Sequence, residues 1–118
     1  MCRVILTNRQ DFDQYDKEHG VYNLMVYLEK QCGGQGNGYA LIKNGRIIET
    51  RKGTTLDNKK IYSRIKDKKW DWLVWHTRIR SSGTVADKNC HPFVKGATCL
   101  AMNGTEQNIE YIADAFDT

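Results

Sequence analysis

Cys2 follows the initiator Met1 directly, so removal of Met1 would leave an α-amine and a thiol on one residue. An α-amino group has a pKa of roughly 8, and near neutral pH it can take the proton of a neighbouring thiol. Such a residue contains both a nucleophile and its base. A cysteine here is equally compatible with a small residue that enters a first strand. Whether Cys2 acts in catalysis therefore depends on the residues that accompany it.

A predicted strand runs through Trp75 into a polar segment that ends at Gly83 and carries two guanidinium groups and the hydroxyls of Ser81 and Ser82. The planar guanidinium of arginine matches the two oxygens of a carboxylate. Arg78, with the hydroxyl of Ser81 nearby, could therefore receive the carboxylate of a substrate. The same residues could also form an ordinary surface ion pair.

Asn103 and Gly104 end an apolar segment and precede a predicted helix. A side-chain amide next to a glycine N–H can donate two hydrogen bonds to one developing oxyanion. This pair is thus a candidate oxyanion hole. Asn-Gly pairs also form turns and helix caps, and that alternative stays open for the pair alone.

Two other clusters do not predict a ligand. The glycine-rich segment 33–38 follows a predicted helix and opens a hairpin, whereas a dinucleotide-binding turn follows a strand and opens a helix. We interpret it as a loop that brings backbone close to something small. A metal site would need scattered ligands, namely Cys32, Cys90, His91 and Cys99. Their spacing matches no established zinc pattern, so we predict no metal and no cofactor.

Composition predicts a single globular domain. The chain has 118 residues, of which 40% are hydrophobic and 27% are charged. Its early apolar run, Val4 to Leu6, is too short for a signal peptide, and no stretch is long enough to span a bilayer. We therefore expect a cytoplasmic protein whose cysteines are thiols.

The net charge of +4 is concentrated in residues 40–80, which contain twelve Lys or Arg and four Asp or Glu. A basic region of this kind could contact nucleic acid or a phosphorylated substrate. Several of its cations, however, flank Ile61 and Ile65, which is typical of the solvated face of a helix. These cations are Lys59, Lys60, Lys66, Lys68 and Lys69. We consequently expect no nucleic-acid partner and no membrane.

The elements that must position these residues follow from periodicity and turn chemistry. Strands are expected at Arg3–Thr7, Tyr39–Ile42, Ile47–Thr50, Trp70–Trp75 and Ala97–Met102. Helices are expected from Val21 to before Cys32, near Asn58–Lys66 and around Ile109–Phe116, with a polar connection at Asp11–Gly20. Asn44-Gly45 predicts a tight type I′ turn between the second and third strands. The pattern indicates an α+β fold with antiparallel sheet.

The order of these motifs resembles that of the class II glutamine amidotransferases, whose glutaminase domain is an N-terminal-nucleophile hydrolase. Cys2 matches the family nucleophile. The other matches are Gly36-Asn37-Gly38-Tyr39 for the Gly-rich turn, His76-Thr77-Arg78 for H-T-R, Asn89-Cys90-His91-Pro92-Phe93 for N-A-x-P, and Asn103-Gly104 for N-G. The resemblance covers nearly the whole chain.

The resemblance implies one glutaminase-type domain over residues 1–118, built as an αββα sandwich that is incomplete on its C-terminal side. It implies that Cys2 hydrolyses the side-chain amide of L-glutamine through a glutamyl thioester. The ammonia would pass to an acceptor-activating synthetase or transferase partner, and an oligomer could complete the sheet. The implied roles of the remaining residues are the oxyanion hole for Asn103 and Gly104, the α-carboxylate site for Arg78 and Ser81, and the α-ammonium site for Asp117.

Two alternative functions remain from the sequence. The chain could be a non-catalytic, truncated homologue that binds a protein or nucleic acid through its basic region. It could also be an N-terminal-cysteine hydrolase that acts on another amide.

Overall fold

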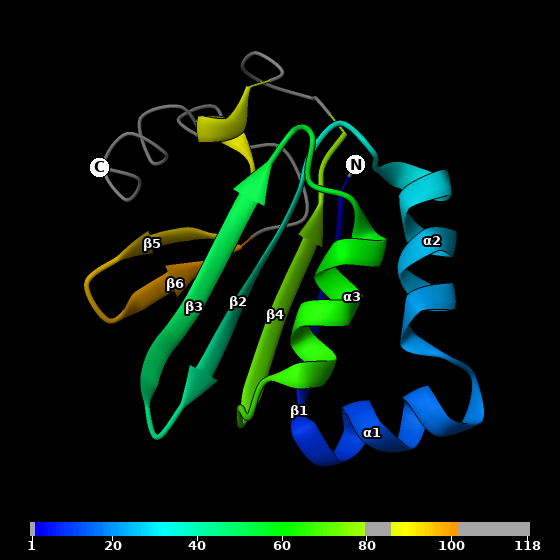
Figure 1. Ribbon diagram of the computed structural model, residues 1–118. Coiled ribbons are helices and arrows are strands. Elements are labelled where there is room, and N and C mark those ends of the chain that lie inside the picture. Colours follow the sequence, from blue (N-terminus) through cyan, green and yellow to red (C-terminus); the bar gives the residue numbers. More distant parts are fainter. Residues whose placement is uncertain (1, 80–85, 102–118) are drawn as a thin grey trace.

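The computed structural model describes residues 2–79 and 86–101, which form an α+β fold (Figure 1). The strands are β1 (Arg3–Asn8), β2 (Asn37–Lys43), β3 (Arg46–Gly53), β4 (Trp72–Thr77), β5 (Phe93–Lys95) and β6 (Thr98–Leu100). The helices are α1 (Arg9–Glu18), α2 (Val21–Cys32) and α3 (Asn58–Asp67), and a 3-10 turn, η1, spans Asp87–Asn89. No helix in residues 2–79 or 86–101 has the length and apolar character needed to cross a membrane.

Four strands form one antiparallel sheet in the order β1-β4-β2-β3, and β5 pairs with β6 in a separate hairpin. The register places Ile5, Trp75 and Tyr39 in one row across three strands. The next row along β4 contains Val4, His76 and Gly38 and faces the other way, because side chains alternate along a strand. The antiparallel sheet expected from the sequence is confirmed.

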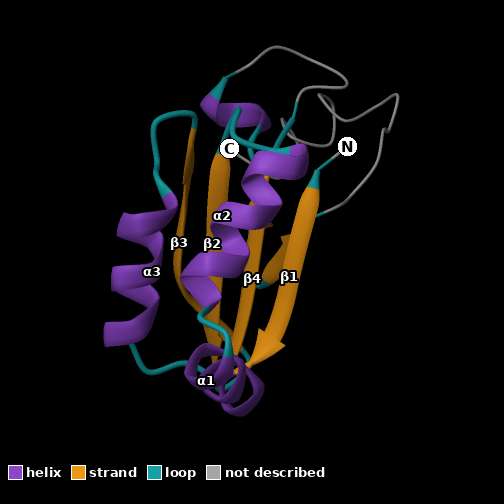
Figure 2. Cartoon of the chain, turned by 90° about the vertical axis from the view of Figure 1, so that its right-hand side faces the viewer, coloured by secondary structure: helices purple, strands orange, loops and turns teal. Residues whose placement is uncertain are grey.

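The two faces of the sheet have different partners (Figures 1 and 2). Helices α2 and α3 cover one face, and the β5–β6 hairpin lies on the opposite side. The helix-facing strand residues Tyr39, Leu41, Leu73 and Trp75 are fully buried with Met25 of α2 in the main apolar core. Burial of these large side chains is the principal stabilising term of the domain.

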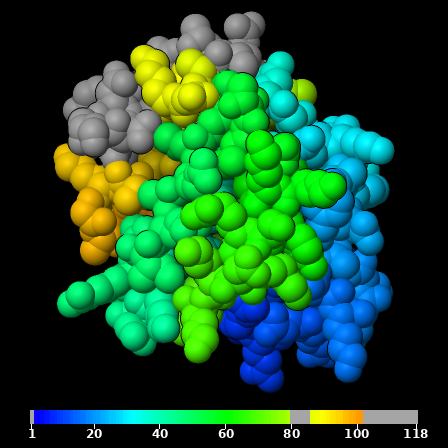
Figure 3. All heavy atoms as spheres, viewed as in Figure 1, coloured from blue at the N-terminus to red at the C-terminus, as the bar shows by residue number. Residues whose placement is uncertain are grey.

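The β2–β3 turn and α3 agree with the sequence prediction. Asn44 and Gly45 both have positive φ, at 52° and 73°, as a type I′ turn requires. Helix α3 buries Ile61 and Ile65 and turns its lysines outward, and Figure 3 shows α3, in green, projecting over the middle of this face. The solvated basic helix face is thus confirmed.

Helix α1 replaces the polar connection expected at Asp11–Gly20, so that prediction was wrong. The side chain of Asn8 accepts a hydrogen bond from the Asp11 N–H at 2.8 Å and caps the helix. Only Phe12 of α1 is fully buried, which explains why hydrophobic periodicity did not reveal the helix. The capping residue was the available signal.

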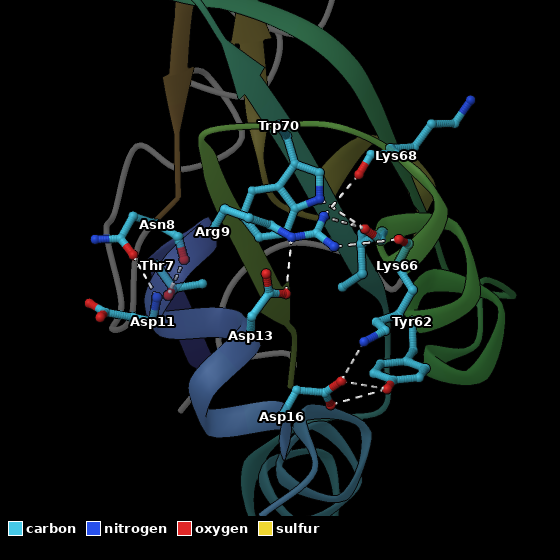
Figure 4. A network of polar contacts seen from close by, with 11 residues as sticks. Thr7, Asn8, Arg9, Asp11, Asp13, Asp16, Tyr62, Lys66, Lys68 and Trp70 are labelled. Atoms are coloured by element: carbon cyan, nitrogen blue, oxygen red, sulfur yellow. Dashed lines mark hydrogen bonds and ion pairs between the residues drawn. The ribbon is translucent and has the colours of Figure 1, made fainter. Parts of the chain in front are cut away.

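Arg9 ties the start of α1 to the end of α3 (Figure 4). Its guanidinium donates to Asp13 Oδ1 at 3.0 Å and lies over the ring of Trp70, 4.8 Å from the ring centroid. It also donates to the carbonyls of Ile65 and Lys66 in the last turn of α3 and to the carbonyl of Lys68, which follows the helix. The last carbonyls of a helix have no partner inside it, so the Arg9 side chain satisfies part of the end of α3.

Most of the predicted strand boundaries differ from the structure, and β4 and β6 are two examples. β4 begins at Trp72 rather than Trp70, because the Trp70 indole N–H donates to the Ile65 carbonyl at 2.8 Å and its ring packs on Phe12. Strand β6 is confined to Thr98–Leu100 within the expected Ala97–Met102. The helix expected around Ile109–Phe116 lies outside the described residues.

Candidate active site

Cys2 lies immediately before β1, beside the end of β4. Because Arg3 pairs with Thr77 in antiparallel register, the residues that precede β1 meet the residues that follow β4. The Cys2 thiol donates to the carbonyl of Ile79 at 3.6 Å, and Cys2 and Arg78 are each about 5% exposed. The candidate nucleophile and the candidate carboxylate receptor therefore occupy adjoining strand ends, although 76 positions separate them in the sequence.

The glycine-rich segment bonds both the N–H and the carbonyl of Arg78. The Gln35 N–H donates to the Arg78 carbonyl at 2.8 Å, and the Arg78 N–H donates to the Gly36 carbonyl at 2.7 Å. These bonds extend the β2–β4 pairing beyond the regular strands. They fix the point from which the Arg78 side chain starts.

The side chain of Thr77 connects the end of β4 to the same glycine-rich segment. Its hydroxyl accepts from the Gly34 N–H at 3.0 Å and donates to Asn37 Oδ1 at 2.7 Å. The Asn37 amide in turn donates to the Leu56 carbonyl at 2.7 Å. The sequence analysis gave Thr77 no role of its own, and its only signal was a hydroxyl on the buried side of a strand.

Gly36 and Gly38 allow a close approach by the segment at Cys90 and His91. A Cβ on Gly38 would lie 1.9 Å from the His91 carbonyl oxygen, and one on Gly36 would lie 2.3 Å from Cys90 Sγ. The expected close approach of backbone is confirmed. Its partner is another part of this chain, and the glycines are needed because no side chain fits.

His91 packs on the sheet face that is turned away from the helices. Its ring stacks on that of His76 with centroids 3.9 Å apart and contacts the ring of Phe93 at 4.5 Å. Burial, together with the nearby positive charges of His76, Arg78 and Lys52, lowers the pKa of His91 to about 3. His91 is therefore neutral near pH 7, and Arg78 contributes a lasting positive charge to this neighbourhood.

The described residues contain no cluster of three or more His, Cys, Asp or Glu side chains that could hold a metal ion. The scattered set of Cys32, Cys90, His91 and Cys99 forms no such cluster. All four cysteines are free thiols. Cys2 and Arg78 thus lie at adjoining strand ends, and a thiol with a guanidinium nearby would suit nucleophilic attack on a substrate that carries a carboxylate.

The remaining predicted site residues lie outside the described part of the chain. They are Ser81, Asn103, Gly104 and Asp117. Their roles as substrate ligands and oxyanion donors stay predictions.

Comparisons with protein-family models, with curated proteins and with solved structures give no match for this chain. The functional assignment accordingly depends on the residues and their geometry.

Proposed function

We propose that this chain is the glutaminase domain of a class II glutamine amidotransferase with an N-terminal-nucleophile fold. One observation carries the proposal. Four separate segments that bear the family-like motifs lie against one another, namely the Cys2 position, the glycine-rich segment 33–38, the His76–Arg78 strand end and the segment 89–93. If these motifs had unrelated roles, nothing would require the four segments to lie close together in the fold.

The chemistry would begin with removal of Met1. The α-amine of Cys2 takes the thiol proton through a water molecule, and the thiolate attacks the side-chain amide carbon of glutamine. Asn103 and Gly104 donate to the resulting oxyanion, and a single donor of this kind contributes roughly 3 kcal/mol. The α-ammonium of Cys2 returns the proton to the amide nitrogen, and the tetrahedral intermediate then expels ammonia and leaves a glutamyl thioester. Water then releases glutamate and restores the thiol.

Arg78 would determine which amide reaches Cys2. Its guanidinium binds the α-carboxylate of the substrate through paired hydrogen bonds, which are stronger in a dehydrated site than in water. Because both its N–H and its carbonyl are bonded to the glycine-rich segment, the backbone of this anchor is held at a fixed place beside Cys2. A fixed distance favours glutamine over amides of other lengths.

The layer order supports an αββα architecture at a coarse level. One face of the antiparallel sheet carries helices, and the other carries the β5–β6 hairpin, where a second sheet would begin. A synthetase or transferase partner in the cytoplasm would receive the ammonia.

The decisive experiment is covalent labelling with a glutamine analogue that carries a diazoketone in place of the side-chain amide. Intact-mass analysis of the full chain should show Met1 absent and one adduct, located at Cys2. Cys2→Ser should abolish the adduct, and Cys99→Ser is the matched control that should retain it. A folded sample with Met1 removed and Cys2 unlabelled would exclude the glutaminase.

An Arg78→Lys variant distinguishes a glutaminase from a hydrolase that acts on another amide. Lysine keeps the charge but loses the planar fork, so labelling by the glutamine analogue should slow by about tenfold or more while reaction with iodoacetamide is unchanged. Protection of the wild-type chain by L-glutamine, and not by D-glutamine, should accompany this result. Equal labelling of both proteins would favour a hydrolase of a different amide.

A binding module is the second candidate, favoured by the solvated lysines of α3 and the residues after it. Cys2→Ala should then leave binding to a partner unchanged. Replacing Lys59, Lys60, Lys68 and Lys69 by glutamine should weaken it and flatten its salt dependence.

A further inference from the structure

The two edge strands of the four-stranded sheet are protected to different degrees. β3 carries Arg46, Arg51 and Lys52 and has an irregular register with β2, and both features discourage pairing with another strand. β1 has no charge between Val4 and Thr7, and none of the described strands pairs with its outer side. An uncharged, regular edge is a template for a further strand.

β1 also presents exposed apolar side chains on the sheet face opposite the helices. Leu6 is 66% exposed and Val4 is 36% exposed. They share this face because they pair with Val74 and His76 on β4, one residue out of phase with buried Trp75. A strand that docks beside β1 would cover both side chains.

A hollow of about 320 Å³ lies beside the same strand on the helix side. Its lining is mainly apolar and comes from β1, α1 and α2, and it includes Ile5, Phe12 and Val21. The edge therefore offers space for side chains on both faces of an added strand.

Two charged residues of opposite sign flank β1, namely Arg3 at its start and Asp11 in the first turn of α1, beyond Arg9. Arg3 begins the strand and donates only to the neighbouring Cys2 carbonyl, at 3.2 Å, among the contacts of the described residues. Asp11 lines the hollow beyond the other end, and Figure 4 shows its side chain pointing away from the Arg9–Asp13 pair. Within the part of the chain that the structure describes, neither residue forms an ion pair.

We propose that β1 pairs antiparallel with β1 of a second copy of this chain, so that the two four-stranded sheets join edge to edge. An extended strand with a cation at its start and a carboxylate beyond its end is complementary to itself when the two strands run in opposite directions. Antiparallel pairing brings Arg3 of each copy toward Asp11 of the other.

The pleat restricts the register of this pairing. Paired residues in antiparallel strands face the same side, so helix-facing Ile5 must lie opposite another helix-facing residue. A two-fold axis at Ile5 satisfies this condition. It places Val4 opposite Leu6 of the second copy on the exposed face, and Arg3 opposite Thr7 on the side that carries Asp11.

Sedimentation equilibrium on the full chain over a dilution series tests the proposal. The wild-type protein should show a reversible monomer–dimer equilibrium, and Leu6→Lys should weaken dimerisation by about tenfold or more, because a lysine at an edge strand opposes pairing. Ile48→Lys is the matched control, since Ile48 is an exposed apolar residue on the opposite edge strand. A wild-type chain that stays monomeric, or a dimer disrupted only by Ile48→Lys, would overturn the inference.

Charge reversal provides the second arm. Arg3→Glu and Asp11→Lys should each weaken dimerisation, and the double variant should restore it, which loss of folding could not imitate. Amide exchange in Val4–Thr7 should slow as concentration rises. Cys2→Ser should dimerise as the wild type does, so the outcome is independent of the glutaminase proposal. Failure of the double variant to recover would reject the register centred on Ile5.

Discussion

At the scale of single residues, His91 shows how burial changes the chemistry of a side chain. It is covered by His76 and Phe93, and positive charges nearby disfavour its protonated form. Its pKa of about 3 lies well below the ordinary value of 6.5. The unfolded chain therefore binds a proton at His91 in a pH range where the folded chain does not.

This difference predicts that stability falls as the pH is lowered from 6.5 toward 3. The loss should reach about 1.4 kcal/mol per pH unit for one proton, because the unfolded state binds more protons throughout that window. Urea unfolding between pH 6.5 and about 5 lies above the range in which most carboxylates titrate. A titration by NMR should show the His91 ring neutral across this interval.

His19 supplies the control for that measurement, since its side chain is 63% exposed. His19→Gln should keep the wild-type pH dependence, whereas His91→Gln should remove it. An unchanged slope in His91→Gln would mean that another group is responsible.

Glu49 determines a second, more acidic part of the stability curve. The hydrogen bond from Arg64 is the main cause that lowers the pKa of Glu49, and the Tyr39 hydroxyl adds to it at 2.5 Å. Burial, together with the same contact, raises the pKa of Tyr39 to about 12. Because the folded-state pKa of Glu49 is lowered, its contribution to the free energy of unfolding is fully present above pH 4.5. This contribution is lost as the pH falls through the folded-state pKa. This loss begins below the window used for His91.

At the scale of elements, one arginine and one glycine join parts of the chain that are far apart in the sequence. Arg9 satisfies the end of α3, and Gly38 leaves room for the segment that carries His91. Neither contact is local in sequence. Each can be tested by a substitution with a matched control.

Gly38→Ala should destabilise the fold by about 2–3 kcal/mol, because its Cβ would overlap a backbone oxygen that cannot rotate away. Gly45→Ala is the control. It meets nothing within 4 Å, but its φ of 73° costs a non-glycine residue about 1–2 kcal/mol. Thermal unfolding measures both changes. Only Gly38→Ala should shift the NMR resonances of His91, and a variant that leaves them in place would disprove the contact.

Arg9→Lys should lower the free energy of unfolding by about 1–2 kcal/mol, since an ammonium cannot serve the Asp13 carboxylate and three carbonyls at once. Arg51→Lys changes an exposed residue of β3 in the same way and should have little effect. Chemical denaturation compares the two. Equal losses would show that the Arg9 network contributes nothing specific.

At the scale of the whole molecule, stability should be unevenly distributed. β2 and β4 lie inside the sheet and contain fully buried residues such as Leu41 and Trp75. The β5–β6 hairpin has three residues in each strand and belongs to a separate two-stranded sheet. Small peripheral units of this kind open before the core does.

Native-state hydrogen exchange should therefore give the highest protection in β2 and β4 and markedly lower protection in β5 and β6. The exchange of central amides should follow the free energy of global unfolding. Uniform protection across both sheets would contradict this order, and would indicate that the hairpin unfolds together with the core.

The sequence predicted the elements whose signals are local. Asn44-Gly45 indicated the hairpin, since only a few residues accept two positive φ angles in succession. Ile61 and Ile65 indicated α3 through their spacing. Helix α1 was missed because its single fully buried residue, Phe12, leaves no periodic stripe, and its main signal is a cap.

For the site, the sequence by itself determined residue types and their order. It identified Cys2 as a potential nucleophile, Arg78 as a potential carboxylate receptor and the glycines as a place of close approach. It could not reveal that Thr77 links the glycine-rich segment, or that His91 stacks on His76 with a lowered pKa. Only the tertiary structure decided these contacts and brought Cys2 beside Arg78. The physical reason is that strand pairing and burial join residues far apart in the chain, and no local pattern records which strand lies next to which.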